Sequence, residues 1–272
     1  TIAVDCGHGA AAKATEKALK DLGATVHAIN CDYNGMDIND GCGSTHLGIV
    51  AELVASGEFD LGIAHDGDAD RVLAVDETGA EVDGDQIMAV LAVDLVSRDA
   101  LPGATVVATV MSNLGFERAL KEHGIAVVKT RVGDRYVLDQ MRSSGAVFGG
   151  EQSGHVIFLE HATTGDGLVT AVQLAAAVMR SERRLSELAR VMNRYPQVMK
   201  NVHVADRGML SSSATIAEAV RAAEAELGDT GRVLVRASGT EPLVRVMVEA
   251  ADEGEAAAIV DRLSAVVKAE LG

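Results

Sequence analysis

Residues 1–29, TIAVDCGHGAAAKATEKALKDLGATVHAI, decide the fold of this 272-residue chain. The apolar residues 1–5 predict a strand, the glycine-rich turn after them leads into a helix over residues 13–22, and residues 24–29 predict a second strand. Gly23 stands where a glycine commonly ends a helix. Strands joined through a helix in this way pair in parallel. The opening segment therefore predicts an α/β layer.

The alternation of strands and helices continues to about residue 195 and then changes. Helices are expected over residues 47–56, 85–96, 115–122, 136–143 and 166–179, and strands on either side of residues 65–71 and over residues 104–109, 125–130 and 147–150. After Tyr195-Pro196 the order becomes strand (200–204), helix (214–227), two strands (232–235 and 243–250) and helix (255–271). We predict an α/β plus α+β protein: two three-layer α/β domains, residues 1–80 and 81–195, and a small α+β domain, residues 196–272.

Composition excludes several classes of function. The net charge of −16 argues against a nucleic-acid partner, and the absence of Trp with 3% aromatic residues argues against base-stacking surfaces. Three cysteines without a CxxC pair predict a reducing compartment, and no apolar run is long enough to span a membrane. With no secretory signal in view, we expect a cytoplasmic protein with no membrane partner. The chain opens with a strand and not with Met, so we expect that its beginning has been removed.

Residues 65–71, HDGDADR, place carboxylates at every second position. If this segment is extended, Asp66, Asp68 and Asp70 point the same way and can converge on Mg²⁺, which prefers hard oxygen ligands. An EF-hand calcium loop is rejected, because Arg71 stands where its sharp turn needs Gly and the flanks predict strands. A solvated acidic turn and a structural Asp–Arg pairing stay open as alternatives. Arg71 beside the triad can hold a phosphate through its two-pronged guanidinium.

Residues 236–242, RASGTEP, lie between two expected strands and combine hydroxyls, a glycine and backbone N–H groups. Such a turn can form an anion-binding nest, with Arg236 and Arg245 supplying guanidinium groups. Arg245 lies on the strand face opposite Val244 and Val246, so it need not belong to the core. An ordinary hairpin loop is the alternative.

Residues 149–155, GGEQSGH, follow a short expected strand. Glu151 and Ser153 are two positions apart and can both contact the paired hydroxyls of a sugar, while His155 can bind phosphate or move a proton. For each residue taken alone, a surface charge or a hydrogen-bonded turn residue is the simpler interpretation. Asp166 is expected to cap the helix that follows it.

Four motifs, DGDADR (66–71), VGDRYV (132–137), GGEQSGH (149–155) and RASGTEP (236–242), follow one another along the chain. Together they resemble the α-D-phosphohexomutase superfamily, and DINDGCGSTH (37–46) is similar to its bacterial phosphoglucosamine mutase branch. The resemblance implies interconversion of glucosamine 6-phosphate and glucosamine 1-phosphate, through a phosphoserine and a bisphosphorylated sugar that also serves as activator. It implies Mg²⁺ as cofactor and a phosphohexosamine as substrate, in the supply of cell-wall amino sugars.

The resemblance also assigns roles residue by residue. Asp66, Asp68 and Asp70 would hold the metal, Arg71 would stabilise phosphoryl oxygens, and His155 would act nearby. The substrate would be bound by Glu151, Ser153, Asp134 and Arg135 on the sugar side, and by Arg236, Ser238, Gly239, Thr240 and Arg245 on the phosphate side.

The sequence departs from the family pattern at one decisive point. The family's first domain carries the nucleophilic serine in a T-A-S-H-N-P loop, and these 272 residues contain no such loop. We therefore expect the family's domains two to four, inactive without the first domain, with an exposed face that favours a homodimer. A non-catalytic phosphosugar-binding protein, or a phosphomannomutase or phosphoglucomutase, are the alternatives. Ala69 stands where the family usually has Gly.

Overall fold

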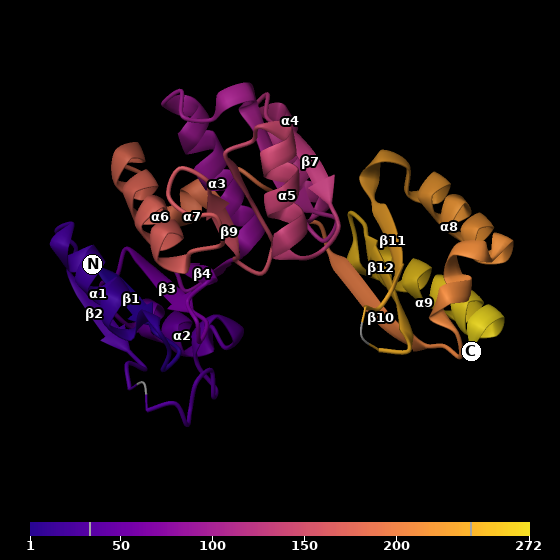
Figure 1. Ribbon diagram of the computed structural model, residues 1–272, viewed down its shortest axis with the longest axis horizontal. Coiled ribbons are helices and arrows are strands. Elements are labelled where there is room, and N and C mark those ends of the chain that lie inside the picture. The colour runs from indigo at the N-terminus through magenta and orange to yellow at the C-terminus, as the bar shows by residue number, and fades with distance from the viewer. Residues whose placement is uncertain (33, 240) are drawn as a thin grey trace. The chain divides into compact units, whose positions relative to one another are not determined.

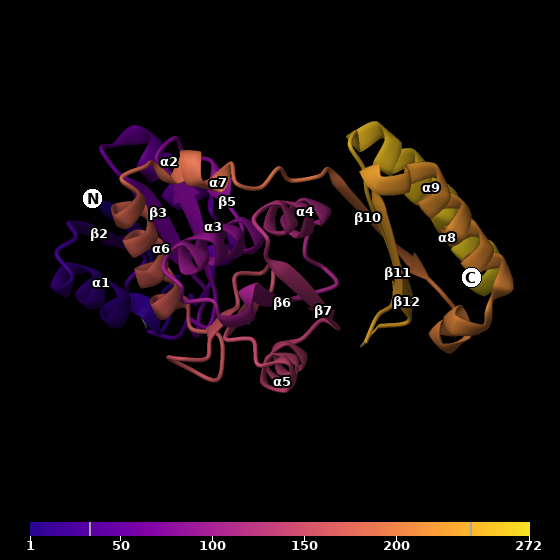
Figure 2. The same cartoon turned by 90° about the horizontal axis from the view of Figure 1, so that it is seen from above.

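The computed structural model describes residues 1–32, 34–239 and 241–272, which form two compact units (Figures 1 and 2). The first unit comprises Thr1–Ser112 and Phe116–Asn193, and the second comprises Asn113–Gly115 and Arg194–Gly272. Each unit has its own hydrophobic core.

The first sheet of the first unit contains both parallel and antiparallel pairs. Its order is β2 (Val26–Ile29), β1 (Ile2–Asp5), β3 (Leu61–His65), β4 (Val72–Asp76), β5 (Glu81–Val82). Strand β1 pairs in parallel with β2 and β3, which confirms the predicted pairing of the opening unit, and β4 returns antiparallel to β3. Helices α1 (Ala11–Asp21) and α2 (Gly48–Ser56) pack into separate cores of this sheet, so it is the middle of three layers.

The second sheet has the order β7 (Ala126–Thr130), β6 (Thr105–Thr109), β8 (Phe148–Gly150), β9 (Val156–Phe158). Strand β6 is parallel to β7 and β8, and β9 is antiparallel to β8. The associated helices are α3 (Gly84–Ser97), α4 (Leu114–Glu122), α5 (Asp134–Ser144), α6 (Gly167–Ser181) and α7 (Leu185–Ala189). One core contains Val4 and Ile63 from the first sheet together with Met88 and Phe148, so side chains from residues 1–80 and 81–195 pack against one another. The division of this unit into two domains stays a prediction.

The second unit is an antiparallel sheet covered by helices, as predicted for an α+β fold. Its order is β10 (Gln197–His203), β12 (Leu243–Glu249), β11 (Arg232–Ala237). Helices α8 (Ala214–Leu227) and α9 (Glu253–Leu271) share one core with Val244, Val246 and Val248, so both cover the same face of the sheet (Figure 2).

The elements missing from the sequence-based prediction are the short ones. Strands β5 and β9 and helix α7 are defined by their neighbours in space and not by a long hydrophobic period. Strand β10 begins three residues earlier than expected because it pairs with β12 along its full length. The predicted cap at Asp166 is confirmed, since its Oδ1 accepts a hydrogen bond of 3.0 Å from the Val169 N–H. In the part of the chain that the structure describes, no helix is both long enough and apolar enough to cross a bilayer.

Candidate functional site

The acidic turn between β3 and β4, Asp66–Arg71, is called the metal loop below. One carboxylate oxygen from each of Asp66, Asp68 and Asp70 lies within 4.8 Å of the others, as the sequence predicted. The segment is a tight turn between the two strands and is not extended, because Ala69 adopts a left-handed backbone (φ 60°) and its N–H donates to the Asp66 carbonyl. Ala69 therefore occupies a conformation that favours glycine, which carries no Cβ to crowd the backbone.

The charges of the metal loop are only partly balanced by protein groups. Burial, together with the Asp70 and Asp68 carboxylates, raises the pKa of Asp66 to about 6, although a hydrogen bond from the Arg71 N–H acts against this. Arg71 Nε lies 3.7 Å from an Asp66 oxygen and 3.6 Å from an Asp70 oxygen. The Asp70 oxygen nearest Arg71, Oδ1, is buried and lies at ion-pair distance, but it has no hydrogen-bond partner among the described residues. Three crowded oxygen ligands with an unsatisfied buried atom fit a small divalent cation such as Mg²⁺.

The glycine-rich turn after β1 supports the metal loop. The Ala10 N–H donates to the Gly67 carbonyl (2.9 Å), and a Cβ added to Gly9 would lie 2.2 Å from that oxygen. Asp5 is fully buried and accepts hydrogen bonds from the Gly7 and Gly43 N–H groups. This explains the glycines of the turn: the backbone of one loop lies directly against the backbone of the other.

His65, the last residue of β3, lies beneath the metal loop and is completely buried. Its Nδ1 is 3.2 Å from the Arg71 carbonyl oxygen and its Nε2 is 3.1 Å from the Thr15 hydroxyl of α1. A carbonyl only accepts hydrogen bonds, so Nδ1 carries the proton and Nε2 accepts from Thr15. Burial lowers the pKa of His65 to about 4, so the ring is neutral at pH 7. The sequence analysis did not predict the contact between Thr15 and His65, because fifty residues separate them along the chain.

The GGEQSGH turn lies against the metal loop. Arg71 and His155 form an isolated antiparallel β-bridge, and His155 Nε2 lies 3.7 Å from an Asp70 oxygen. The same Nε2 accepts a hydrogen bond from the Gly165 N–H (3.1 Å), while the buried Nδ1 has no hydrogen-bond partner among the described residues. The histidine ring is thus packed and hydrogen-bonded, and its proposed role in catalysis stays a prediction.

Glu151 connects this turn to the VGDRYV segment. Its Oε1 accepts from the Gly133 N–H (2.9 Å), immediately before Asp134, the first residue of α5. Arg135 is exposed with its Nε 3.7 Å from Asp139, and Ser153 is exposed as well. The first unit therefore brings Glu151 next to the Asp134–Arg135 turn. The substrate roles of these side chains stay predictions.

The phosphate-side residues lie in the second unit, which is described by itself. Arg236 of β11 and Arg245 of β12 are direct cross-strand partners, on the sheet face opposite the buried Val244 and Val246. Burial and the neighbouring Arg245 charge lower the pKa of Arg236. Like charges placed opposite each other destabilise a sheet, and here a Glu241 oxygen 3.3 Å from Arg245 Nη2 balances part of the charge. The role of the two arginines in binding phosphate stays a prediction.

Arg207, which the sequence analysis did not identify as a site residue, holds the loop after β11. Arg207 Nη1 donates to the Ser238 and Glu241 carbonyls. Ser238 is buried, and its hydroxyl accepts from the Glu241 N–H (3.3 Å). Gly239 is exposed, and Thr240, also predicted to bind phosphate, lies outside the described residues.

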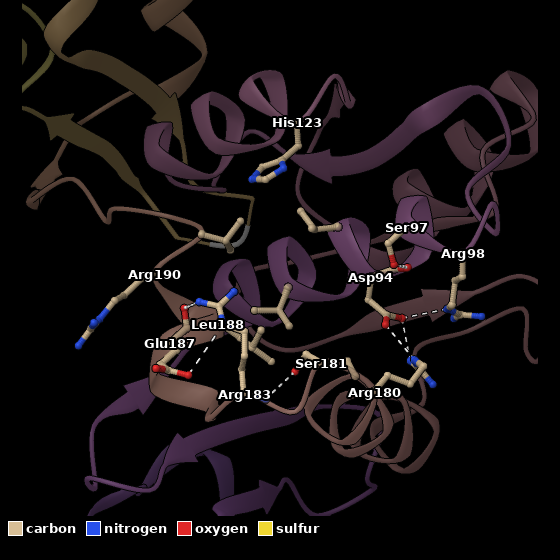
Figure 3. A pocket seen from close by; sticks show the side chains of 14 residues that line it. Asp94, Ser97, Arg98, His123, Arg180, Ser181, Arg183, Glu187, Leu188 and Arg190 are labelled. Atoms are coloured by element: carbon tan, nitrogen blue, oxygen red, sulfur yellow. Dashed lines mark hydrogen bonds and ion pairs between the residues drawn. The ribbon is translucent and has the colours of Figure 1, made fainter.

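A cavity of about 530 Å³ in the first unit contains none of the predicted site residues (Figure 3). Asp94 in its wall accepts hydrogen bonds from Arg98 and Arg180, and Arg183 Nε lies 3.8 Å from a Glu187 oxygen. Figure 3 shows these side chains paired with one another. Ion pairs thus hold these charged side chains of the wall, and apolar side chains such as Val90 and Leu188 line it beside them.

Family models match the chain in three consecutive segments. Residues 1–79 match α/β/α domain II of phosphoglucomutase/phosphomannomutase, residues 83–195 match α/β/α domain III, and residues 199–266 match the C-terminal domain. The chain belongs to the phosphoglucomutase/phosphomannomutase family. The two α/β sheets and the small C-terminal unit described above fall within these three matched segments.

Curated relatives of this family member are named phosphoglucosamine mutase. The one from Streptomyces coelicolor is 57% identical over 271 residues, which are 100% of this chain and 60% of the relative. The one from Clavibacter michiganensis is 55% identical over 99% of this chain and 62% of the relative. The chain thus spans about 60% of the length of the relatives that it matches.

Solved structures share the fold at low sequence identity. The structure of Aspergillus fumigatus N-acetylphosphoglucosamine mutase in complex with GlcNAc-6P and magnesium is 23% identical with a TM-score of 0.80, covering 98% of this chain and 61% of that one. A phosphoglucomutase/phosphomannomutase family protein from Burkholderia thailandensis is 24% identical with a TM-score of 0.81, covering 98% of this chain and 60% of that one. These matches confirm the predicted fold class.

Proposed function

We propose that the chain is the metal- and substrate-binding part of a phosphoglucosamine mutase, which interconverts glucosamine 6-phosphate and glucosamine 1-phosphate. The observation that carries the proposal is the convergence of the Asp66, Asp68 and Asp70 carboxylates beside the GGEQSGH turn. The relatives named phosphoglucosamine mutase, 57% and 55% identical, support the choice of sugar. A cytoplasmic location is part of the same proposal.

In this proposal residues 1–80 supply the metal loop, 81–195 recognise the sugar and 196–272 bind the phosphate that does not react. Asp66, Asp68 and Asp70 would hold Mg²⁺, as their crowded oxygens and the unsatisfied Asp70 atom suggest. When bound, Mg²⁺ neutralises charge on a phosphoryl group during transfer. The Aspergillus fumigatus enzyme in complex with GlcNAc-6P and magnesium supports these two ligand classes.

The side chains of the chain would orient the sugar phosphate and stabilise charge. Arg71 would face the phosphoryl oxygens while Asp66 and Asp70 hold its guanidinium. Glu151 would accept a hydrogen bond from a sugar hydroxyl through the oxygen that Gly133 leaves free, and Ser153 would add a second polar contact. Arg236 and Arg245 would grip the distant phosphate, which relieves their mutual repulsion.

The proposed reaction also needs a phosphoryl donor. The 272 residues contain no T-A-S-H-N-P loop, so we propose that the phosphoserine comes from another segment and that these residues alone bind substrate without turnover. A phosphosugar-binding protein without catalysis is the second candidate.

A coupled assay for glucosamine 1-phosphate formation tests the proposal. The 272-residue chain is compared with the same chain joined to a phosphoserine-bearing first domain, with Mg²⁺ and a sugar bisphosphate present. Turnover only by the longer protein is expected, and Asp66→Asn should abolish it. Mannose and glucose phosphates, run as competing substrates, test the sugar. Turnover by the shorter chain would refute the proposed mechanism, and binding without turnover by either protein would favour the binding protein.

A further inference from the structure

Two buried polar side chains support the metal loop through hydrogen bonds, and neither is one of the three carboxylates. Thr15 of α1 and His65 at the end of β3 are both completely buried. The Thr15 hydroxyl donates to His65 Nε2, and His65 Nδ1 donates to the Arg71 carbonyl. This forms a chain of hydrogen bonds from helix α1 to the last residue of the loop.

The first residue of α6 makes a second hydrogen bond to the backbone of the metal loop. The Gly167 N–H donates to the Ala69 carbonyl (2.9 Å), and a Cβ added to Gly167 would lie 2.4 Å from the Arg71 oxygen and 2.8 Å from His65 Nδ1. The two carbonyls that flank Asp70 in the sequence are therefore both hydrogen-bonded to groups beneath the loop. The left-handed conformation of Ala69 is maintained by these bonds, because a strained backbone persists only where its surroundings determine it.

The Thr15 hydroxyl has a specific effect on the ring. A neutral imidazole can place its proton on either nitrogen, and only the form with the proton on Nδ1 can donate to Arg71. The Arg71 carbonyl therefore selects the form with the proton on Nδ1, and the Thr15 hydroxyl stabilises that form by donating to Nε2. Without the hydroxyl, the buried Nε2 would lose this donor and the ring would be held in place only through Nδ1.

We propose that Thr15 and His65 are positioning residues that set the magnesium affinity of the metal loop, by fixing the Arg71 carbonyl and with it the turn that carries Asp66, Asp68 and Asp70. The inference rests on the proposed function, since it presupposes that the three carboxylates bind Mg²⁺. Neither residue touches the metal. Groups that orient metal ligands commonly change metal affinity tenfold or more when they are removed.

The test measures Mg²⁺ binding by calorimetry and Mn²⁺ binding by its electron paramagnetic resonance spectrum, on the full 272-residue chain. We expect Thr15→Val to weaken Mg²⁺ binding about threefold to tenfold and His65→Leu about tenfold or more. His65→Asn should bind within about threefold of the unchanged chain, because its amide N–H can replace Nδ1–H toward Arg71. In the His65→Asn background Thr15→Val should have no further effect on binding, because Nε2 is absent.

Thr109→Val is the matched control. Thr109 is also buried in the first unit, and its hydroxyl accepts a hydrogen bond from the Met111 N–H. This variant should lose stability without any change in Mg²⁺ affinity or in the Mn²⁺ spectrum. Equal Mg²⁺ affinities for Thr15→Val and the unchanged chain would overturn the inference, as would failure of His65→Asn to bind better than a folded His65→Leu. If the unchanged chain bound no Mg²⁺, the proposed metal site would itself be refuted.

Discussion

Gly9→Ala tests whether the close contact between the glycine-rich turn and the metal loop determines the stability of the first unit. The new Cβ would lie 2.2 Å from the Gly67 oxygen and 2.7 Å from the Gly67 carbonyl carbon. Carbon and oxygen atoms approach to about 3.3 Å, so the two loops must separate by roughly 1 Å. The Ala10–Gly67 hydrogen bond, at 2.9 Å, is then stretched beyond the usual range.

The magnitude follows from these displacements. Overpacking costs about 1–3 kcal/mol and a lost hydrogen bond adds about 1 kcal/mol. Replacing Gly by Ala also lowers the conformational entropy of the unfolded chain, which by itself stabilises the folded state by about 0.4–1 kcal/mol. We expect the free energy of unfolding to fall by about 2 kcal/mol and Mg²⁺ binding to weaken, because Gly67 lies between two of the aspartates.

Urea unfolding and Mg²⁺ calorimetry measure both effects. Gly48→Ala is the control, because Gly48 begins α2 and a Cβ there meets no atom within 4 Å. It should leave the free energy of unfolding unchanged or slightly raised. If Gly9→Ala changed stability by less than about 0.5 kcal/mol and left Mg²⁺ affinity intact, the two loops would be free to separate and the reasoning would be refuted.

Three further perturbations address the metal loop, the ion-paired Asp94 in the wall of the 530 Å³ cavity, and the loop after β11. Mg²⁺ at a hundred times its dissociation constant should raise the free energy of unfolding by about 2.7 kcal/mol, measured by urea titration, and chelation with EDTA or the change Asp70→Asn should remove this gain. Burial raises the pKa of Asp94, but the hydrogen bonds from Arg180 and Arg98 together outweigh it and hold the pKa below its usual value. The ionised carboxylate therefore stabilises the folded chain above about pH 4, and this stabilisation is lost as the pH falls through the lower pKa of the folded state. The difference in unfolding free energy between the unchanged chain and Asp94→Asn should therefore shrink in acid, measured by denaturation at a series of pH values. Arg207→Ala should weaken binding of glucosamine 6-phosphate several-fold, measured by calorimetry, because the Ser238 and Glu241 carbonyls lose their common donor.

Each of these has a result that would count against it. A gain from Mg²⁺ that persists in Asp70→Asn would place the cation elsewhere. A pH-independent difference for Asp94→Asn would mean that the carboxylate has the same pKa in the folded and unfolded chains. Unchanged sugar phosphate binding by Arg207→Ala would show that the loop keeps its shape without this anchor, and Arg221→Ala, an exposed arginine on α8, controls for the loss of charge.

The sequence predicted the triad because the information is local. Asp66, Asp68 and Asp70 lie within five residues, and any turn short enough to join β3 to β4 brings them together. The conformation of that turn was not predicted, because the left-handed backbone of Ala69 depends on hydrogen bonds to groups from α6 and from the end of β3. Arg236 and Arg245 lie directly opposite each other because of the register in which β11 pairs with β12, and the sequence pattern does not specify this register.

The sequence by itself determined the order of strands and helices in the long elements, the acidic metal loop and the family, because hydrophobic period and short motifs are properties of neighbouring residues. Only the tertiary structure decided that Thr15, His65 and Arg71 form one hydrogen-bonded chain and that Arg207 holds the loop at Ser238. Those partners come from distant segments, and buried polar groups find them only when the chain folds, since leaving them unpaired away from water costs about 1–3 kcal/mol each.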